Sequence, residues 1–293
     1  MKLTRLIVAL ACLMGAVCSA TAQDDLNPTV IATLNKLNYN PKIQRATAGS
    51  VIGEVAVAVL AGQTSKEMIG YENAVRAAVL QGISRSYRIT AVDALTDEDL
   101  EYPYTISIDG DITNMTTTTK TDVQTYEVKG EKKTRTVTYF RGQVAVTLQV
   151  KDAHDLSIIA SPNFNVMATD MAWIETPEGA MNKTLEVLAK KVYTYFNGLF
   201  PLTATIIERA GEKNDKQKEV YVDVGSRHGI AINDVLIVYK PTSIGGKSAR
   251  TEIARLKVKK IEGEEVSFCK VTSNGKALKA ALDAGEDLII ETR

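Results

Sequence analysis

Residues 143–150 read Gln-Val-Ala-Val-Thr-Leu-Gln-Val, with a branched aliphatic side chain at every second position. Side chains along a strand alternate between the two faces of a sheet, so the aliphatic residues share one face and the others share the opposite face. This pattern predicts a strand that has one face buried in the core and the other exposed to solvent. It begins near Val137, and the turn-like residues 151–155 lead into a second strand at 156–160, which predicts a hairpin.

The segment that precedes this strand, Asn114–Thr136, is strongly biased to threonine and lysine. Because β-branched threonine favours strand over helix, the segment predicts a projecting hairpin with its tip at 129–133. A flexible loop is the alternative. A membrane-crossing hairpin would need an apolar outward face, which residues 115–123 do not supply. The charged residues of the tip are the candidate partner-binding residues: Lys129, Glu131, Lys132 and Lys133.

Further elements flank the hairpin. Residues 23–50 read as a polar lead-in with one short helix, and 53–61 as a central strand. Apolar residues at three- and four-residue steps predict a helix after the 62–64 turn, and strands are expected at 88–92 and 104–110. A second amphipathic helix is predicted at 177–196. Its apolar stripe consists of Leu185, Leu188, Ala189, Val192, Tyr193 and Phe196.

The pattern changes at 198–201, where short strands divided by turn residues begin. Many short strands with little helix predict a small barrel over residues 201–293. Glycines in its connections are expected to provide tight turns, which makes Gly225, Gly229 and Gly285 the structural turn residues. The chain is thus expected to fold as two domains, at 23–200 and 201–293.

The first residues predict export. Lys2 and Arg5 precede an apolar run that ends in small residues, and Ala20 and Ala22 satisfy the cleavage rule for a signal peptide, residues 1–22. An uncleaved anchor is the alternative, but the run is short for a membrane span. Lipidation of Cys18 would tether the chain, although the residues before it fit a lipidation pattern poorly. The expected location is the periplasm or the periplasmic face of the outer membrane.

Two stretches resemble known families. Residues 220–239, with the turn Gly225–Gly229, and the closing residues 284–289 resemble the small C-terminal barrel of flagellar assembly protein T. The order of elements from 54 to 196 is similar to the CsgG and LpoB group, which comprises the curli secretion lipoprotein and an activator of penicillin-binding proteins. The resemblances imply an α+β chain: a mixed or antiparallel CsgG/anticodon-binding-like sandwich with packed helices, followed by an all-β SH3-like barrel.

Reactive residues are sparse in the sequence. Cys269 lies in an alternating strand, where a small buried residue is expected, while His154 and His228 lie in turn-like sequence. No phosphate-binding loop, metal-ligand spacing or nucleophile elbow occurs, so no cofactor, metal site or catalytic residue is expected. The segments 84–86 and 97–99 read as solvated loop or helix-end residues.

A hydrolase that uses only carboxylates is the alternative of another class. Asp109 and Asp111 lie two apart on a strand and therefore share a face. A deep apolar surrounding with raised carboxyl pKa values would support catalysis by this pair.

The charge balance excludes one class of partner. The chain has 35 basic and 35 acidic residues, so it lacks the basic excess typical of proteins that bind nucleic acid. We therefore expect a non-catalytic envelope accessory protein that binds other envelope proteins and contacts the membrane only by association. A homo-oligomeric ring or secretion-complex subunit, with 114–136 as contact arm, is the runner-up.

Overall fold

The computed structural model describes residues 27–39 and 65–292, with side chains of the second range described from Tyr71 onward. It is a mixed α/β chain composed mostly of sheet. This confirms the expectation that the chain combines helices with sheets. The chain divides into two compact units, Val30–Phe196 and Asn197–Arg293, and residues 27–29 group with the second. The expected signal peptide, Cys12, Cys18 and the strand expected at 53–61 lie outside the described residues.

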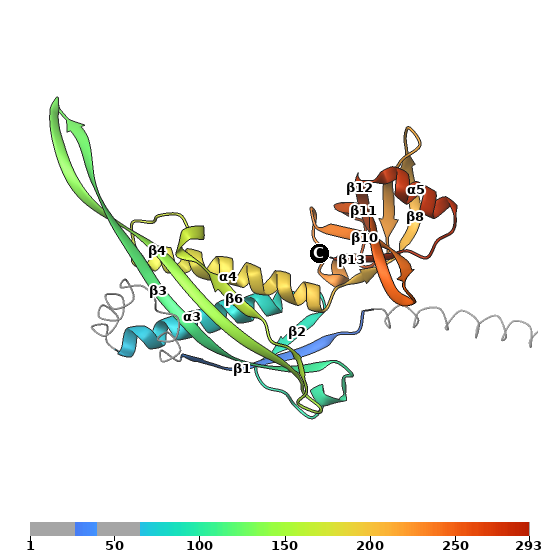
Figure 1. Cartoon of the computed structure of the whole chain (residues 1–293), viewed down its shortest axis with the longest axis horizontal. Coiled ribbons are helices and arrows are strands. Elements are labelled where there is room, and N and C mark those ends of the chain that lie inside the picture. Colours follow the sequence, from blue (N-terminus) through green and yellow to red (C-terminus); the bar gives the residue numbers. More distant parts are fainter. Residues whose placement is uncertain (1–26, 40–64, 293) are drawn as a thin grey trace, which may run out of the picture. The chain divides into compact units, whose positions relative to one another are not determined.

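The first unit contains a six-stranded mixed sheet in the order β2-β1-β3-β4-β5, with β6 also paired to β4. Strand β1 is parallel to β2 and β3, and the other pairs are antiparallel. Figure 1 labels most of these strands, whose bounds are β1 Val30–Tyr39, β2 Ile89–Val92, β3 Thr105–Val128, β4 Glu131–Asp152, β5 Ile158–Ala160 and β6 Asn163–Val166.

Strand β1 corrects one expectation, because residues 30–39 were predicted to lie in a polar lead-in with a short helix. Residues 30–34 are all buried, since β1 is flanked by neighbours on both sides. A strand inside a parallel arrangement is buried on both faces and does not alternate, so its short apolar run has no diagnostic period.

Two helices cover one face of this sheet, α3 at Ser65–Ser84 and α4 at Pro177–Leu199 (Figure 1). The predicted alternation at residues 143–150 is confirmed, because Val144, Val146, Leu148 and Val150 are fully buried on this face. Gly142 lies on the same face, where an added Cβ would be 2.3 Å from Thr184 Oγ1 of α4. The main partner of β4 is β3, whereas the 156–160 segment pairs with β4 only at Val150 and Lys151.

Beyond the helices, β3 and β4 continue as one long hairpin (Figure 1). Their pairing runs from Ile106–Asp152 to Val128–Glu131, with a bulge between Ile112 and Asn114. The turn contains only Lys129 and Gly130, at φ 54° and 81°. Two positive φ values in a two-residue loop match the right-handed twist of the strands. The expected five-residue tip is therefore too long, because Glu131, Lys132 and Lys133 already belong to β4.

The second unit is a seven-stranded antiparallel sheet in the order β7-β13-β10-β11-β12-β9-β8. The strands at its two edges are consecutive in the chain and are separated only by Thr205, so the sheet must curl until its edges meet. The unit also contains α5, Gly275–Asp283, which the sequence reasoning missed. The strand bounds are β7 Thr203–Ala204, β8 Ile206–Glu212, β9 Gln217–Val222, β10 Val235–Ile244, β11 Lys247–Ile261, β12 Ser267–Ser273 and β13 Ile289–Thr292.

The three turn glycines differ in what they do. Gly229 and Gly285 have positive φ values of 73° and 65°, which L-residues adopt at a cost. Gly225 instead has extended backbone at φ −144°. An added Cβ there would lie 2.4 Å from the carbonyl oxygen of Gly263, so Gly225 permits a close approach of two chain segments.

Candidate functional site

The outer part of the β3–β4 hairpin, residues 120–139, is called the arm here. Strand β1 pairs with β3 only as far as Ile112, and β6 pairs with β4 only at residues 144–147. The last cross-strand support for β4 is the isolated bridge between Phe140 and Ile174. Within the described ranges the arm strands therefore pair only with each other, and both of their outer edges are unpaired.

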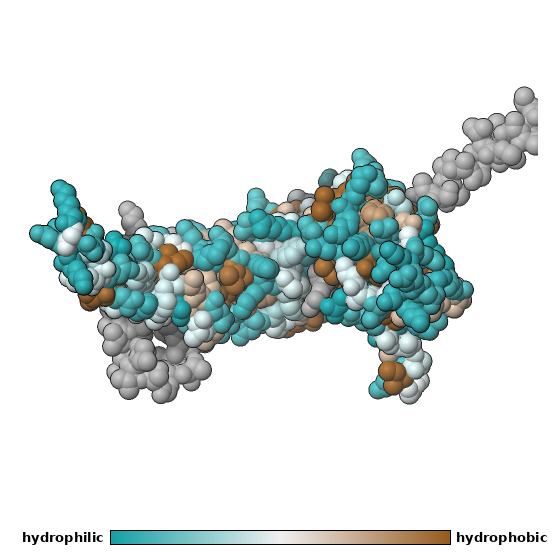
Figure 2. Space-filling model, turned by 90° about the horizontal axis from the view of Figure 1, so that it is seen from above, coloured by the Kyte–Doolittle hydropathy of each residue, from teal (hydrophilic) through white to brown (hydrophobic). Residues whose placement is uncertain are grey.

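The two faces of the arm carry different side chains. One face is mostly threonine, and its most exposed apolar residue is Val123, with 70% of its surface accessible. The opposite face combines cations with aromatic rings. Figure 2 shows the arm, at the left, as largely hydrophilic. The residues of the cationic face are Lys120, Asp122, Gln124, Tyr126, Val128, Glu131, Lys133, Arg135, Val137 and Tyr139.

A cluster of cations and aromatic rings lies where the arm joins the sheet, on the face opposite the helices. The Arg141 guanidinium carbon is 4.2 Å from the centroid of the Trp173 ring. Lys120 Nζ is 5.3 Å from the centroids of both Trp173 and Tyr139. Lys120 also pairs with Asp122 at 2.7 Å. We call Lys120, Tyr139, Arg141 and Trp173 the arm-root cluster.

Sequence reasoning did not find the arm-root cluster. Trp173 lies in the irregular segment between β6 and α4, and it reaches Arg141 because Ile174 exchanges backbone hydrogen bonds with Phe140, at 2.7 and 3.0 Å. That bridge puts Trp173 opposite Arg141 on the same face. The only available sequence signal was that Trp173 is the single tryptophan of the chain.

The residues that the sequence did single out, Lys129, Glu131, Lys132 and Lys133, lie together at the exposed end of the arm. Lys132 lies opposite Glu127, and Lys133 lies opposite Tyr126. Because successive strand residues point to opposite faces, Lys132 and Lys133 do not form one cationic surface. None of the four forms a side-chain hydrogen bond or ion pair within the part of the chain that is described.

Asp109, one member of the candidate carboxylate pair, is a partly exposed side chain held in an ion pair. Asp109 accepts hydrogen bonds from Lys151 Nζ at 2.9 Å and from Asn35 Nδ2 at 3.2 Å. The hydrogen bond from Lys151 is the main reason that the pKa of Asp109 lies below its ordinary value. The hydrolase hypothesis required a carboxyl with a raised pKa, so the environment of Asp109 opposes a role as general acid.

The remaining reactive side chains serve local structure. His154 Nδ1 is 2.8 Å from Asp152 Oδ1, and its Nε2 is 3.1 Å from the Leu100 carbonyl oxygen. The pKa of His154 is raised, chiefly by the hydrogen bond with Asp152. His228 Nδ1 accepts a hydrogen bond from the Gly225 N–H at 3.2 Å, within the turn. Cys269 is buried, as expected, and burial raises the pKa of its thiol to about 12.

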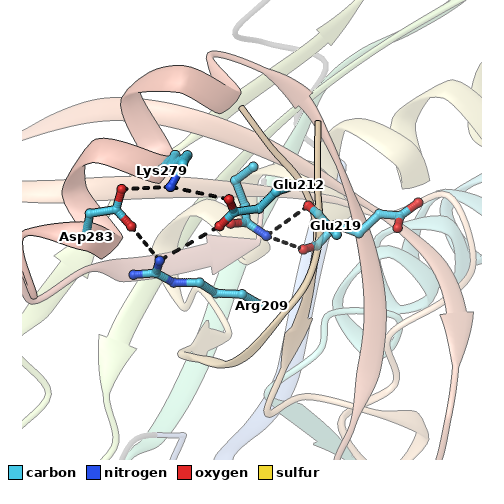
Figure 3. Close-up of polar contacts among 7 residues, drawn as sticks. Arg209, Glu212, Glu219, Lys279 and Asp283 are labelled. Atoms are coloured by element: carbon cyan, nitrogen blue, oxygen red, sulfur yellow. Dashed lines mark hydrogen bonds and ion pairs between the residues drawn. The ribbon is translucent and has the colours of Figure 1, made fainter. Parts of the chain in front are cut away.

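A separate network of charges in the second unit joins α5 to β8 (Figure 3). Lys279 Nζ is 2.8 Å from Asp283 and 3.3 Å from Glu212, and Arg209 is 2.6 Å from Asp283. The network contains as many anions as cations, and its four side chains are partly exposed. It therefore ties the helix to the sheet and leaves no uncompensated charge.

The end of the first unit opposite the arm is acidic and partly apolar. Residues 93–104 include Asp93, Asp97, Glu98, Asp99 and Glu101, and the carboxylate of Asp99 accepts hydrogen bonds from Thr96. Nearby exposed apolar residues are Leu100, Tyr102, Tyr104, Leu156, Ile158 and Ile159. Because β3 begins at residue 105 and ends at the arm tip, this acidic end and the arm lie at opposite ends of one strand pair (Figure 1).

Two features are absent from the described residues. No described helix has the length and apolar character to cross a membrane. Within residues 27–39 and 65–292, no group of three or more His, Cys, Asp or Glu side chains is arranged to hold a metal ion. For Ser84 and Ser86, the structure shows local hydrogen bonds to the carbonyl groups of Leu80 and Gly82 in α3.

No protein-family model and no curated protein matches the sequence. Among solved structures, the chain is similar to a Helicobacter pylori protein described as a neuraminyllactose-binding hemagglutinin homolog, at 13% identity. It is also similar to a Xanthomonas campestris protein of family DUF330, at 11% identity. Each match covers 59% of this chain and 83% of the other, with a TM-score of 0.29, which is too low to support an argument about function.

Proposed function

We propose that the protein is an exported, non-catalytic accessory protein of the Gram-negative cell envelope that acts by binding other proteins through the arm. The expected signal peptide would deliver it to the periplasm, where it contacts the membrane only through its partners. Neither a cofactor nor nucleic acid has a role in this proposal.

The observation that carries the proposal is the arm itself. Two strands without a third strand or a covering helix are at best marginally stable in water. Such a ribbon also presents two rows of unpaired backbone groups, which are templates for pairing with another chain. An arm of this length with exposed Val123 and Tyr126 is therefore best explained as a binding element that a partner covers.

We also propose finer assignments for the two units. A CsgG/anticodon-binding-like sandwich is supported in the first unit by helices packed on one face of a mixed sheet. An SH3-like barrel is supported in the second unit by a curled antiparallel sheet whose edge strands, β7 and β8, are separated by one residue. Both assignments follow from the resemblances to the CsgG and LpoB group and to flagellar assembly protein T.

The test compares two shortened hairpins. In one variant, Lys120 is joined to Tyr139 by an Asn-Gly turn, which removes the arm and keeps the paired residues below it. In the control, the exposed β10–β11 tip, Ser243–Ser248, is shortened in the same way.

A photoreactive residue in place of Tyr126 should capture a protein in the native envelope, and one in place of Ile244 should not. The proposal also expects the arm-shortened variant, but not the control, to lose activity in the host while its circular dichroism stays native-like. Equal capture at both positions, or full activity without the arm, would contradict the proposal.

A second candidate, a homo-oligomer, is favoured by the charge distribution of the first unit. The arm, residues 120–139, carries five basic and three acidic residues, and the opposite end of the same strand pair, residues 93–104, is acidic with exposed apolar groups. Complementary surfaces at two ends of one molecule permit head-to-tail association. Light scattering would then give a multiple of the monomer mass for the intact chain and the monomer mass after arm shortening. A monomer in both cases would exclude this candidate.

A further inference from the structure

The Arg141 side chain has unusually few partners for a half-buried cation. Its Nε atom is buried and has no hydrogen-bond partner. The side chain forms no ion pair with any carboxylate of the described chain. A buried donor that gains no hydrogen bond in exchange for its lost water is costly, and the cost is larger for a charged group. Arg141 therefore has guanidinium donors that no group of the described chain occupies.

The surroundings of Arg141 hold its guanidinium group in place. The group lies 4.2 Å from the centroid of the Trp173 ring, and Lys120 lies near the same ring at 5.3 Å. Cations are attracted to the face of an aromatic ring, so Trp173 orients the planar guanidinium. Two cations around one indole also repel each other. Asp122 pairs with Lys120 and leaves the charge of Arg141 uncompensated.

We propose that Arg141, Lys120 and Trp173 form a site for one oxyanion group, a carboxylate or a phosphate. The flat guanidinium presents paired N–H donors that match the two oxygens of such a group. Lys120, which is also paired with Asp122, is a second cation near the same ring. The ring of Trp173 fixes the donors before the anion arrives, which reduces the entropy lost on binding. This site is independent of whether the arm binds a partner protein.

The test uses the fluorescence of Trp173, the only tryptophan in the sequence. The purified mature chain is titrated with inorganic phosphate and, separately, with acetate, while sodium chloride holds the ionic strength constant. A ring in contact with Arg141 should report binding as a saturable change. We expect an apparent Kd of roughly millimolar for such small anions. The stronger of the two titrations identifies whether the natural ligand group is phosphate or carboxylate.

Three variants separate the site from general charge effects. Arg141→Met keeps the apolar stem on Trp173 but removes every donor, and it should weaken binding by roughly tenfold or more. Arg141→Lys should retain part of the affinity, because lysine keeps the charge but lacks the paired donors. Lys247→Met removes the same charge from the exposed β10–β11 tip and should leave binding unchanged. Circular dichroism confirms that each variant is folded.

A second measurement covers the case in which anion binding does not change the fluorescence of Trp173. The Nε–H resonance of Arg141 in a nitrogen-15 spectrum, assigned by its loss in Arg141→Met, should shift on addition of the same anion. The proposal is overturned if neither anion produces a saturable response in either measurement. It is also overturned if Arg141→Met binds as tightly as the unaltered chain, or if Lys247→Met weakens binding to the same degree as Arg141→Met.

Discussion

Gly82, in α3, lies where α3 contacts α4. An added Cβ there would be 2.6 Å from the carbonyl oxygen of Ala189 and 2.7 Å from Cβ of Val192. Val192 is fully buried, so it has no free space into which to move. Gly198, in the last turn of α4, is exposed, and an added Cβ there would meet nothing within 4 Å. The same substitution, glycine to alanine, should therefore have opposite effects at these two positions.

The magnitudes follow from two competing terms. Replacing glycine by alanine inside a helix stabilises it by about 1 kcal/mol, because the unfolded chain loses conformational freedom. Forcing a methyl group into a packed interface costs roughly 1–3 kcal/mol, because side chains or backbone must shift. At Gly82 the neighbouring carbonyl oxygen belongs to the backbone, so the cost should prevail. We expect Gly82→Ala to destabilise the fold by about 1 kcal/mol or more, and Gly198→Ala to stabilise it by up to about 1 kcal/mol.

Urea unfolding followed by Trp173 fluorescence measures this difference, because the tryptophan lies in the first unit. Circular dichroism provides a second signal from the helices. A Gly82→Ala/Val192→Ala double variant should be destabilised by nearly the sum of its single variants, because the closest contacts, with the Ala189 carbonyl oxygen and Cβ of residue 192, both remain. The reasoning is refuted if Gly82→Ala stabilises the protein as Gly198→Ala does, or if Val192→Ala removes most of the destabilisation caused by Gly82→Ala.

Two predictions concern titratable groups. Burial raises the pKa of Cys269 to about 12, so this thiol should not react with a thiol reagent at pH 8 in a folded protein that consists of residues 23–293, and it should react after unfolding. Because the folded pKa is the higher one, the stability contributed by the neutral thiol is present below pH 9.0 and is lost as pH rises toward about 12. Rapid labelling of folded protein would contradict the buried position. The pKa of His154 is raised above 6.5, mainly by Asp152, so its contribution to stability is present below pH 6.5 and is lost as pH rises through the folded pKa. An NMR titration should show the His154 pKa above 6.5 and a lower value in Asp152→Asn, and an unchanged pKa in that variant would remove the proposed cause.

Local patterns were reliable where each strand or helix buries one face. The alternation at 143–150 and the helical stripe around Val75, Val79 and Ile83 both predicted the buried side correctly. Strand β1 was missed, because its buried residues 30–34 form a run without a period. Helix α5 was missed as well. It is short, and Leu278 and Ala281 are its only fully buried residues, so its pattern was too brief to stand out among strands.

By itself, the sequence determined which segments bury an apolar face and that a threonine-rich hairpin turns near residues 129–133, because these properties depend on side chains a few positions apart. The full length of the hairpin, Thr105–Asp152, and its two-residue turn were visible only in the structure. Only the tertiary structure decided that Trp173 meets Arg141 and Lys120, and that Asp109 is paired with Lys151. These contacts join residues 32 to 53 positions apart for Trp173 and 42 apart for Asp109. The register of the β3–β4 pair and the Phe140–Ile174 bridge create them, and register is a property of paired strands that neither strand encodes alone.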